Sequence, residues 1–231
     1  MARGYDSYAG HSNKVLWSAP SLSYPSSAFT LAAKGYPLQA DTDGSCLFCL
    51  TSQSAGHWAA IAYDTSTHAN GRWQFQAWDG SLAQNTLDDT DWVDGKWFSL
   101  VGRQHSNVWH EFDILRLDTG RTHNDNDNTS TLNWQYSTWK LVQGNNDSSY
   151  GYDRGWDGYW AETAYWNVAL TDAEVEAYQD GYAPLLIRPE NLLFYDPGVA
   201  VLRPDQIAGG TGAETGTVES FPHPPGIIYK E

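Results

Sequence analysis

Two carboxylates on one candidate strand are the residues best placed by type and spacing to do chemistry. Glu111 and Asp113 are separated by a single residue in the segment from His110 to Arg116. Retaining glycosidases use two carboxyl groups about 5–5.5 Å apart, one as the nucleophile and one as the acid and base. The pair therefore raises the hypothesis of a glycoside hydrolase. We favour the alternative, in which Glu111 and Asp113 are ordinary polar residues of a strand.

An aromatic loop offers a different chemistry, the binding of a sugar. The polar, glycine-rich stretch over residues 144–158 contains Tyr150, Tyr152, Asp153 and Trp156. Aromatic rings beside a carboxylate can stack on a sugar ring and hydrogen-bond its hydroxyl groups, and long loops on a rigid scaffold commonly carry binding sites. These four residues form our candidate ligand-binding set. The same rings could instead pack the loop onto the sandwich or face another subunit.

Oxygen-rich side chains in a second loop are the candidates for a metal ion. The predicted loop over residues 119–133 contains Asp125 and Asp127, with asparagines between and after them. Calcium prefers oxygen ligands, but the segment lacks the glycine and the bidentate glutamate of an EF-hand loop. We therefore favour a solvated Asn/Asp turn and expect no cofactor. Binding of Ca²⁺ by Asp125 and Asp127 is the alternative.

The two cysteines, Cys46 and Cys49, have a C-x-x-C spacing. A zinc site needs a second pair of ligands, and a redox motif opens a helix in a βαβ unit; neither context is visible. The surrounding apolar run predicts a buried strand, in which residues three apart lie on opposite faces. We expect two buried free thiols, which fits assembly in a reducing cytoplasm.

The elements that hold these residues are predicted to be strands with one short helix. Apolar and alternating segments recur at short intervals with turn residues between them, which is typical of a β-sandwich. The helix is predicted over residues 171–180, because Thr171 to Glu174 forms a capping box and Gly181 follows where a left-handed C-cap is favoured. A βαβ pattern is missing, which disfavours a parallel sheet. The predicted strands are Phe29–Ala33, Cys46–Thr51, His57–Tyr63, Arg72–Trp78, Lys96–Gly102, Phe112–Leu117, Thr138–Gln143, Gly158–Trp166 and Leu192–Tyr195.

The strand that precedes the helix carries a glutamate among aromatic residues. Strict alternation places Trp160, Glu162, Ala164 and Trp166 on one face of this strand. A carboxylate on such a face must be paired or hydrogen-bonded if it is buried. We interpret Glu162 as a structural residue.

Length and charge narrow the classes of function. The 231 residues fit a single all-β sandwich. The net charge is −15, from 28 acidic and 13 basic residues, which argues against binding to nucleic acid or to an anionic membrane surface. The first residues lack the apolar core of a secretory signal, and no run of about 18 apolar residues predicts a transmembrane helix.

The segment from Gly158 to Val175 resembles the closing segment of the laminin-G-like, concanavalin A-like jelly-roll family. It carries the spacing A-E-x-x-x-W-N-x-A-L-T-x-x-E, starting at Ala161. The resemblance implies an all-β, antiparallel β-sandwich jelly roll with one short helix. Further segments are similar to the stand-alone members of this family that are common in bacteriophage genomes. This similarity implies a virion-associated protein on a capsid, tail or fibre. The segments are Met1–Asp6, Asp94–Val101, Pro184–Pro189, Leu192–Tyr195 and the terminal Pro-Pro-x-Ile-Ile-Tyr.

Retaining glucanases of this fold carry Glu-x-Asp-x-x-Glu on one strand, with the first carboxylate as nucleophile and the third as acid and base. Glu111 and Asp113 match the first two places, but Arg116 stands at the third. Without a proton donor the leaving sugar is not protonated. The resemblance therefore does not extend to catalysis, and we expect no enzymatic activity.

The chain changes character near Pro204, where glycine-rich and then proline-rich stretches begin. We predict a jelly-roll domain over residues 1–203 and an extended C-terminal arm over residues 204–231, which docks along a sheet edge of its own or of a neighbour. The expected function is that of a non-enzymatic virion accessory protein, made in the host cytoplasm, which forms a homo-oligomer and contacts other capsid or tail proteins. A glycan-binding module for attachment to the host surface is the alternative.

Overall fold

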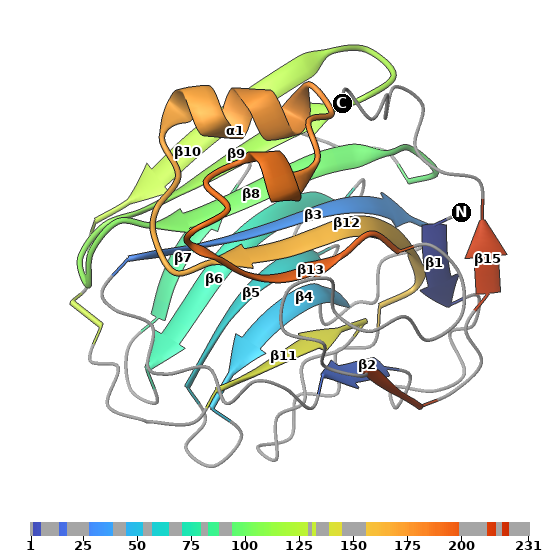
Figure 1. The fold of residues 1–231 in the computed structure, drawn as a ribbon, viewed down its shortest axis with the longest axis horizontal. Helices are drawn as coiled ribbons and strands as arrows, with labels where there is room; N and C mark the ends of the chain where they lie inside the picture. Colours follow the sequence, from blue (N-terminus) through green and yellow to red (C-terminus); the bar gives the residue numbers. More distant parts are fainter. Residues whose placement is uncertain are drawn as a thin grey trace.

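The computed structural model describes residues 2–5, 14–17, 28–38, 45–52, 57–64, 71–79, 83–87, 94–128, 131–132, 139–144, 156–198, 212–215 and 219–221. These residues form two antiparallel sheets packed face to face, with a short helix on the outer side of one sheet (Figure 1). The predicted all-β sandwich is confirmed.

Sheet A holds the strands that position the site described below. Its order is β10-β9-β8-β3-β12-β1-β15, and β13 also pairs with β12. Every pairing is antiparallel. The bounds are β10 Arg121–Asp127, β9 His110–Arg116, β8 Phe98–Gln104, β3 Phe29–Pro37, β12 Gly158–Trp166, β1 Ala2–Tyr5, β15 Glu219–Phe221 and β13 Leu192–Asp196.

Sheet B faces sheet A across the core, in the order β14-β2-β11-β4-β5-β6-β7. In β6 the predicted alternation holds, because Trp73, Phe75 and Ala77 are all buried in the main core between the sheets. The ring of Trp73 meets Phe98 from sheet A edge to face, with centroids 5.4 Å apart. The bounds are β14 Gly212–Thr215, β2 Lys14–Trp17, β11 Lys140–Gln143, β4 Ser45–Thr51, β5 His57–Asp64, β6 Arg72–Asp79 and β7 Ala83–Leu87.

A β-bulge in β12 corrects the predicted alternation of this strand. The register against β3 shifts between Ala161 and Ala164, and Glu162 adopts a φ of 53°. One extra residue reverses the faces beyond it, so Trp160 lies in the main core while Trp166 lies on the outer face of sheet A. The two tryptophans therefore do not share a face.

The buried Glu162 has the structural role predicted for it. Its carboxylate accepts a hydrogen bond from the Tyr195 hydroxyl at 2.8 Å, and its carbonyl oxygen accepts one from Tyr178 at 2.7 Å. Lys34 is buried nearby; burial lowers its pKa, and the negative charge of Glu162 opposes that shift. The ammonium of Lys34 lies 5.3 Å from the ring centroid of Tyr178.

A second bulge corrects the placement of the cysteines. The pairing of β4 with β5 shifts between Cys46 and Phe48. The extra residue puts Cys46 and Cys49 in one cluster, with Ala60 and Val142, instead of on opposite faces. Both thiols are free and buried, as predicted.

Helix α1, Asp172–Gln179, and the 3-10 helix η1, Pro184–Leu186, cover the outer face of sheet A (Figure 1). The predicted helix over residues 171–180 is confirmed, and the Glu174 carboxylate accepts hydrogen bonds from both the amide and the hydroxyl of Thr171. Val175 packs with Trp166 of the sheet in a second apolar cluster. Within the described ranges, no helix is long and apolar enough to cross a membrane.

The segment predicted as a C-terminal arm contributes one strand to each sheet. Ala2 to Gly4 in β1 pair with residues 219–221 in β15, and β14 pairs with all of β2. The arm therefore docks on sheet edges of its own chain over these residues, which is the first of the two modes that we considered.

Candidate functional site

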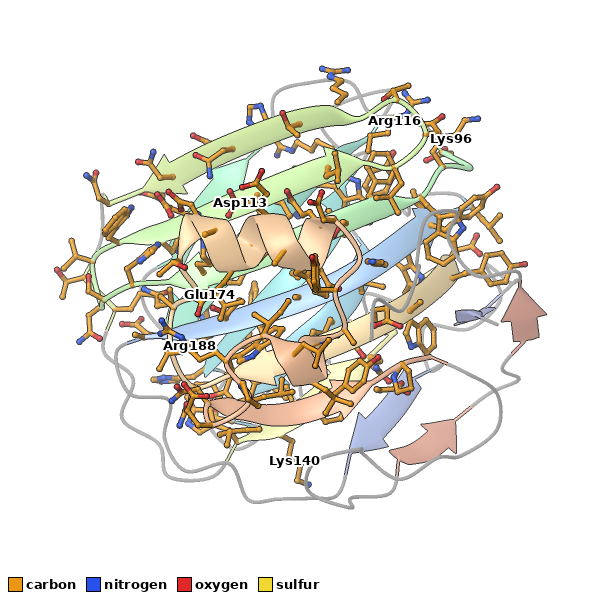
Figure 2. The ribbon with its side chains drawn as sticks, turned by 45° about the horizontal axis from the view of Figure 1, so that its top comes forward. Lys96, Asp113, Arg116, Lys140, Glu174 and Arg188 are labelled. Atoms are coloured by element: carbon orange, nitrogen blue, oxygen red, sulfur yellow. The ribbon has the colours of Figure 1, made fainter. Side chains whose placement is uncertain are left out.

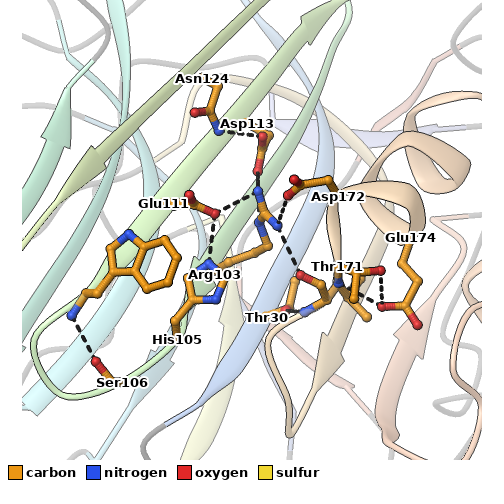
Figure 3. Close-up of polar contacts among 12 residues, drawn as sticks. Thr30, Arg103, His105, Ser106, Glu111, Asp113, Asn124, Thr171, Asp172 and Glu174 are labelled. Carbon is orange, nitrogen blue, oxygen red and sulfur yellow. Dashed lines mark hydrogen bonds and ion pairs between the residues drawn. The ribbon is translucent and has the colours of Figure 1, made fainter.

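A buried arginine on β8 is the centre of the polar site. Arg103 points to the outer face of sheet A, and its side chain is only 3% exposed. Its guanidinium contacts Glu111 Oε2 at 2.8 Å, Asp113 Oδ2 at 2.9 Å and Asp172 Oδ1 at 2.7 Å (Figure 3). It also donates to the carbonyl oxygen of Leu170 at 3.0 Å. One guanidinium thus joins two strands to the start of α1.

The strand register explains why these groups meet. Arg103 on β8 lies opposite Glu111 on β9, so both side chains point to the same face. Asp113 follows two residues later on that face and receives a hydrogen bond from Asn124 Nδ2 of β10 at 2.7 Å. The intervening Phe112 points into the core. The predicted pair of carboxylates is therefore real, but it is bound to a cation.

Burial and charge act together on these groups. Burial alone would lower the pKa of Arg103, but Asp113, Asp172 and Glu111 raise it above its ordinary value. Burial raises the pKa of Asp113, although Arg103 and Asn124 act in the opposite direction. The guanidinium is thus permanently charged, and the carboxylates around it act as acceptors.

The third place of the glucanase pattern lies apart from this site. Arg116 makes a two-pronged ion pair with Asp118, with contacts of 2.6 and 2.9 Å. Figure 2 shows Arg116 beside Lys96 at one end of β9, whereas Asp113 lies in the middle of the strand. The pairing of β9 with both neighbours has no register shift, so residue 116 faces away from residues 111 and 113.

The turn between β8 and β9 carries an exposed tryptophan that the sequence analysis did not single out. The ring of Trp109 stacks on His105, with centroids 4.1 Å apart and planes 15° from parallel. The imidazole of His105 also contacts Glu111, with 2.8 Å between His105 Nε2 and Glu111 Oε2. Trp109 is 41% exposed, and Val108 beside it is 40% exposed.

A signal for this site was present in the sequence. Arg103 and His105 precede a short polar turn, and Glu111 and Asp113 follow it at the same spacing of two. Opposite charges at matching distances from a turn predict cross-strand pairs. The contact of Arg103 with Asp172 has no such signal, because the two residues are 69 positions apart.

Trp156, one of the four candidate ligand-binding residues, is buried in the core of the sandwich instead of presenting its ring to solvent. It is 2% exposed, and its ring centroid lies 5.7 Å from that of Trp73 in the core. The expected role in sugar stacking is therefore corrected for this residue. Tyr150, Tyr152 and Asp153 lie outside the described residues.

The two candidate calcium ligands lie on an edge strand. Asp125 and Asp127 belong to β10, where a loop was predicted, and lie opposite Phe112 and His110 of β9. The Asp125 carboxylate accepts a hydrogen bond from the amide of Asn126 at 2.8 Å. Among the side chains that the structure describes, no three histidine, cysteine, aspartate or glutamate residues come together as a metal site.

Comparison with known proteins defines the fold and leaves the function open. No family model and no curated protein matches this chain. Among solved structures, a candidate carbohydrate-binding protein from Bacteroides ovatus aligns with a TM-score of 0.62 and 14% identity, over 99% of this chain and 62% of that one. The enzymatically active domain of tailspike protein 2 from bacteriophage CBA120 gives 0.57 and 15%, over 81% and 29%. The LG1-3 region of the laminin α2 chain gives 0.55 and 15%, over 71% and 30%.

These similarities place the chain in the laminin-G-like, concanavalin A-like jelly-roll fold, as the sequence resemblance implied. The chain spans less than two thirds of each of the three proteins. Function has to be argued from the site itself, since this fold serves many activities.

Proposed function

We propose that this chain is a non-enzymatic accessory protein of a bacteriophage virion, made in the host cytoplasm and acting through contacts with capsid or tail proteins. The observation that carries the non-enzymatic part is the Arg103 guanidinium, which holds both Glu111 and Asp113. A nucleophilic carboxylate must be free to attack the sugar, and a second group must donate a proton. Here both carboxylates are engaged by one cation, and Arg116 stands in the place of the acid.

A reducing-end assay on β-glucans tests this part directly. The intact protein should release no reducing ends, because Arg103 holds both carboxylates and Arg116 stands in the place of the acid. Turnover by the intact protein that disappears in Glu111→Gln would overturn the proposal.

Exposed apolar side chains beside α1 support a role in protein contacts. Tyr182, Leu185 and Leu186 are all exposed in the short segment around η1, and Leu186 is 57% exposed. Apolar side chains gathered in this way commonly mark an interaction surface. The similarity to a phage tailspike and the sequence resemblance to stand-alone phage proteins favour a virion as the assembly concerned.

Incorporation into particles is the test of the virion role. Mass spectrometry should detect the protein in purified particles, and light scattering should show a homo-oligomer. Leu186→Ser should reduce both, because it removes apolar contact area, whereas Glu176→Ser on the exposed side of α1 should reduce neither. A protein missing from particles and monomeric at high concentration would contradict the proposal.

Glycan binding is the second candidate function, and Trp109 is the observation that favours it. An exposed ring held beside a carboxylate has the two features that recognise a sugar, an apolar face and a hydrogen-bond acceptor. The similarity to a candidate carbohydrate-binding protein agrees with this function.

A further inference from the structure

Hydrogen bonds fix the backbone of the turn between β8 and β9, and the indole of Trp109 stacks on His105. The amide of His105 donates to the carbonyl oxygen of Trp109 at 2.9 Å. The hydroxyl of Ser106 accepts hydrogen bonds from the amides of Val108 and Trp109, both at 3.2 Å. A ring that is ordered before binding loses little conformational freedom when a ligand stacks on it. His105 covers one face of the indole, and the remaining exposure leaves a surface for a ligand.

Polar groups of the right kind stand beside this ring. His105 and Arg103 both contact Oε2 of Glu111, and Oε1 has no hydrogen-bond partner among the described residues. Asn126 lies directly opposite Glu111 on β10, and its side chain is exposed on the same face. A carboxylate oxygen and an amide together can accept from and donate to neighbouring hydroxyl groups.

The local charge selects the class of ligand. Three carboxylates, Glu111, Asp113 and Asp172, surround the single guanidinium of Arg103, which leaves a net charge of −2. The chain as a whole carries −15. An anionic ligand would be repelled both locally and at a distance, whereas a neutral ligand would meet no such penalty.

We propose that Trp109, Glu111 and Asn126 form a binding site for an uncharged pyranose at the end of a glycan. The apolar face of the sugar stacks on the indole, and its hydroxyl groups hydrogen-bond to Glu111 Oε1 and the amide of Asn126. Glycans that end in sialic or uronic acids are excluded by the surrounding carboxylates. This inference rests on the second candidate function, glycan binding, and adds to it the location and the class of sugar.

The test uses an array of immobilised oligosaccharides that end in galactose, glucose, mannose or N-acetylglucosamine, with sialylated and glucuronic-acid-terminated members beside them. The intact protein should bind neutral members only. Trp109→Ala should weaken that binding about tenfold or more, the loss of one stacking contact, and Trp109→Phe should retain part of it. The matched control is Val108→Ala, which shortens the neighbouring exposed side chain without removing a ring and should bind as the intact protein does. Circular dichroism and thermal unfolding confirm that each variant is folded.

The outcomes separate the site from the function. Neutral glycans bound equally well by Trp109→Ala would show that the chain binds sugars elsewhere and would overturn the site. Preference for anionic members would overturn the ligand class. Binding to no member of the array would overturn glycan binding itself and this inference with it.

Discussion

Replacing Arg103 by methionine tests whether the site is held together by a buried cation. The variant leaves Glu111 and Asp113 largely buried without their positive partner. Breaking a buried ion pair from one side typically costs about 3–5 kcal/mol. Asp113 retains Asn124 and Glu111 retains His105, so we expect the lower end, about 3 kcal/mol. Asp172 adds little, because its side chain is 94% exposed.

The deficit should depend on pH. Loss of the guanidinium raises the folded-state pKa of Asp113 further above its unfolded value, since burial already raises it in the intact protein. An ionised, unpaired carboxylate destabilises the fold above that raised pKa. As the pH falls through it, the folded state takes up a proton and the deficit shrinks. The difference from the intact protein should therefore be largest at neutral pH.

Urea unfolding followed by tryptophan fluorescence, at pH 7.5 and at pH 4.5, measures both effects. For a chain of this size, a loss of about 3 kcal/mol corresponds to a drop in Tm of roughly 6–12 °C. Arg116→Met is the control, because it breaks an exposed pair at the end of β9 and should cost less than about 1 kcal/mol. The triple variant Arg103→Met, Glu111→Gln, Asp113→Asn should recover most of the loss. A single Arg103→Met variant as stable as the intact protein at pH 7.5, or a deficit that is the same at both pH values, would show that the buried cation does not hold the site together.

Three further changes probe the core. Burial lowers the pKa of His110 to about 4, so the unfolded state takes up a proton at a higher pH than the folded state does. The free energy of unfolding should therefore fall by up to about 3 kcal/mol as the pH drops from 6.5 to 4. His110→Gln should flatten this decline in urea titrations between these pH values, and an unchanged slope would show that His110 does not cause it. Gly102→Ala puts a Cβ 2.4 Å from the Phe75 ring and should lower stability by about 1–3 kcal/mol, measured as a lower Tm; no change would mean that the ring moves freely. Tyr195→Phe removes the hydroxyl that donates to Glu162 and should cost about 1–3 kcal/mol in chemical denaturation, whereas a neutral result would show that water replaces the hydroxyl.

Most of the sandwich could be predicted from the sequence, because its strands and its helix follow local patterns. The strands outside the predicted set include β10, β14 and β15, which were missed for different reasons. β10 consists of polar residues such as His123 and Asn126, which suit an exposed edge but give no apolar alternation. Strands β14 and β15 lie in a glycine-rich and proline-rich tail, where composition predicts an extended arm but does not mark the residues that pair.

The errors of register have a different cause. A bulge adds one residue that no simple periodicity reveals, so the faces predicted around Glu162 and between the cysteines were wrong. The site was only half predicted. Glu111 and Asp113 were found as a pair, but their partner Arg103 was not singled out, although its distance from the turn matches that of Glu111. Trp156 was predicted to bind a ligand because its loop is rich in aromatic residues, but its ring is buried in the core.

The pairing of β1 with β15, and of β2 with β14, has a consequence for how the chain folds. Ala2 lies opposite Phe221 and Lys14 opposite Thr215, so the contacts that close one edge of each sheet join the most distant parts of the sequence. Contacts between residues so far apart in the sequence form slowly, because a long loop must be closed before they stabilise the fold. On the ribosome, the two sheets acquire these edges only after residues 212–221 have been synthesised. Until β14 and β15 arrive, β1 and β2 are the edge strands of the nascent sandwich, each with one open side, and aggregation during synthesis should begin at these two strands.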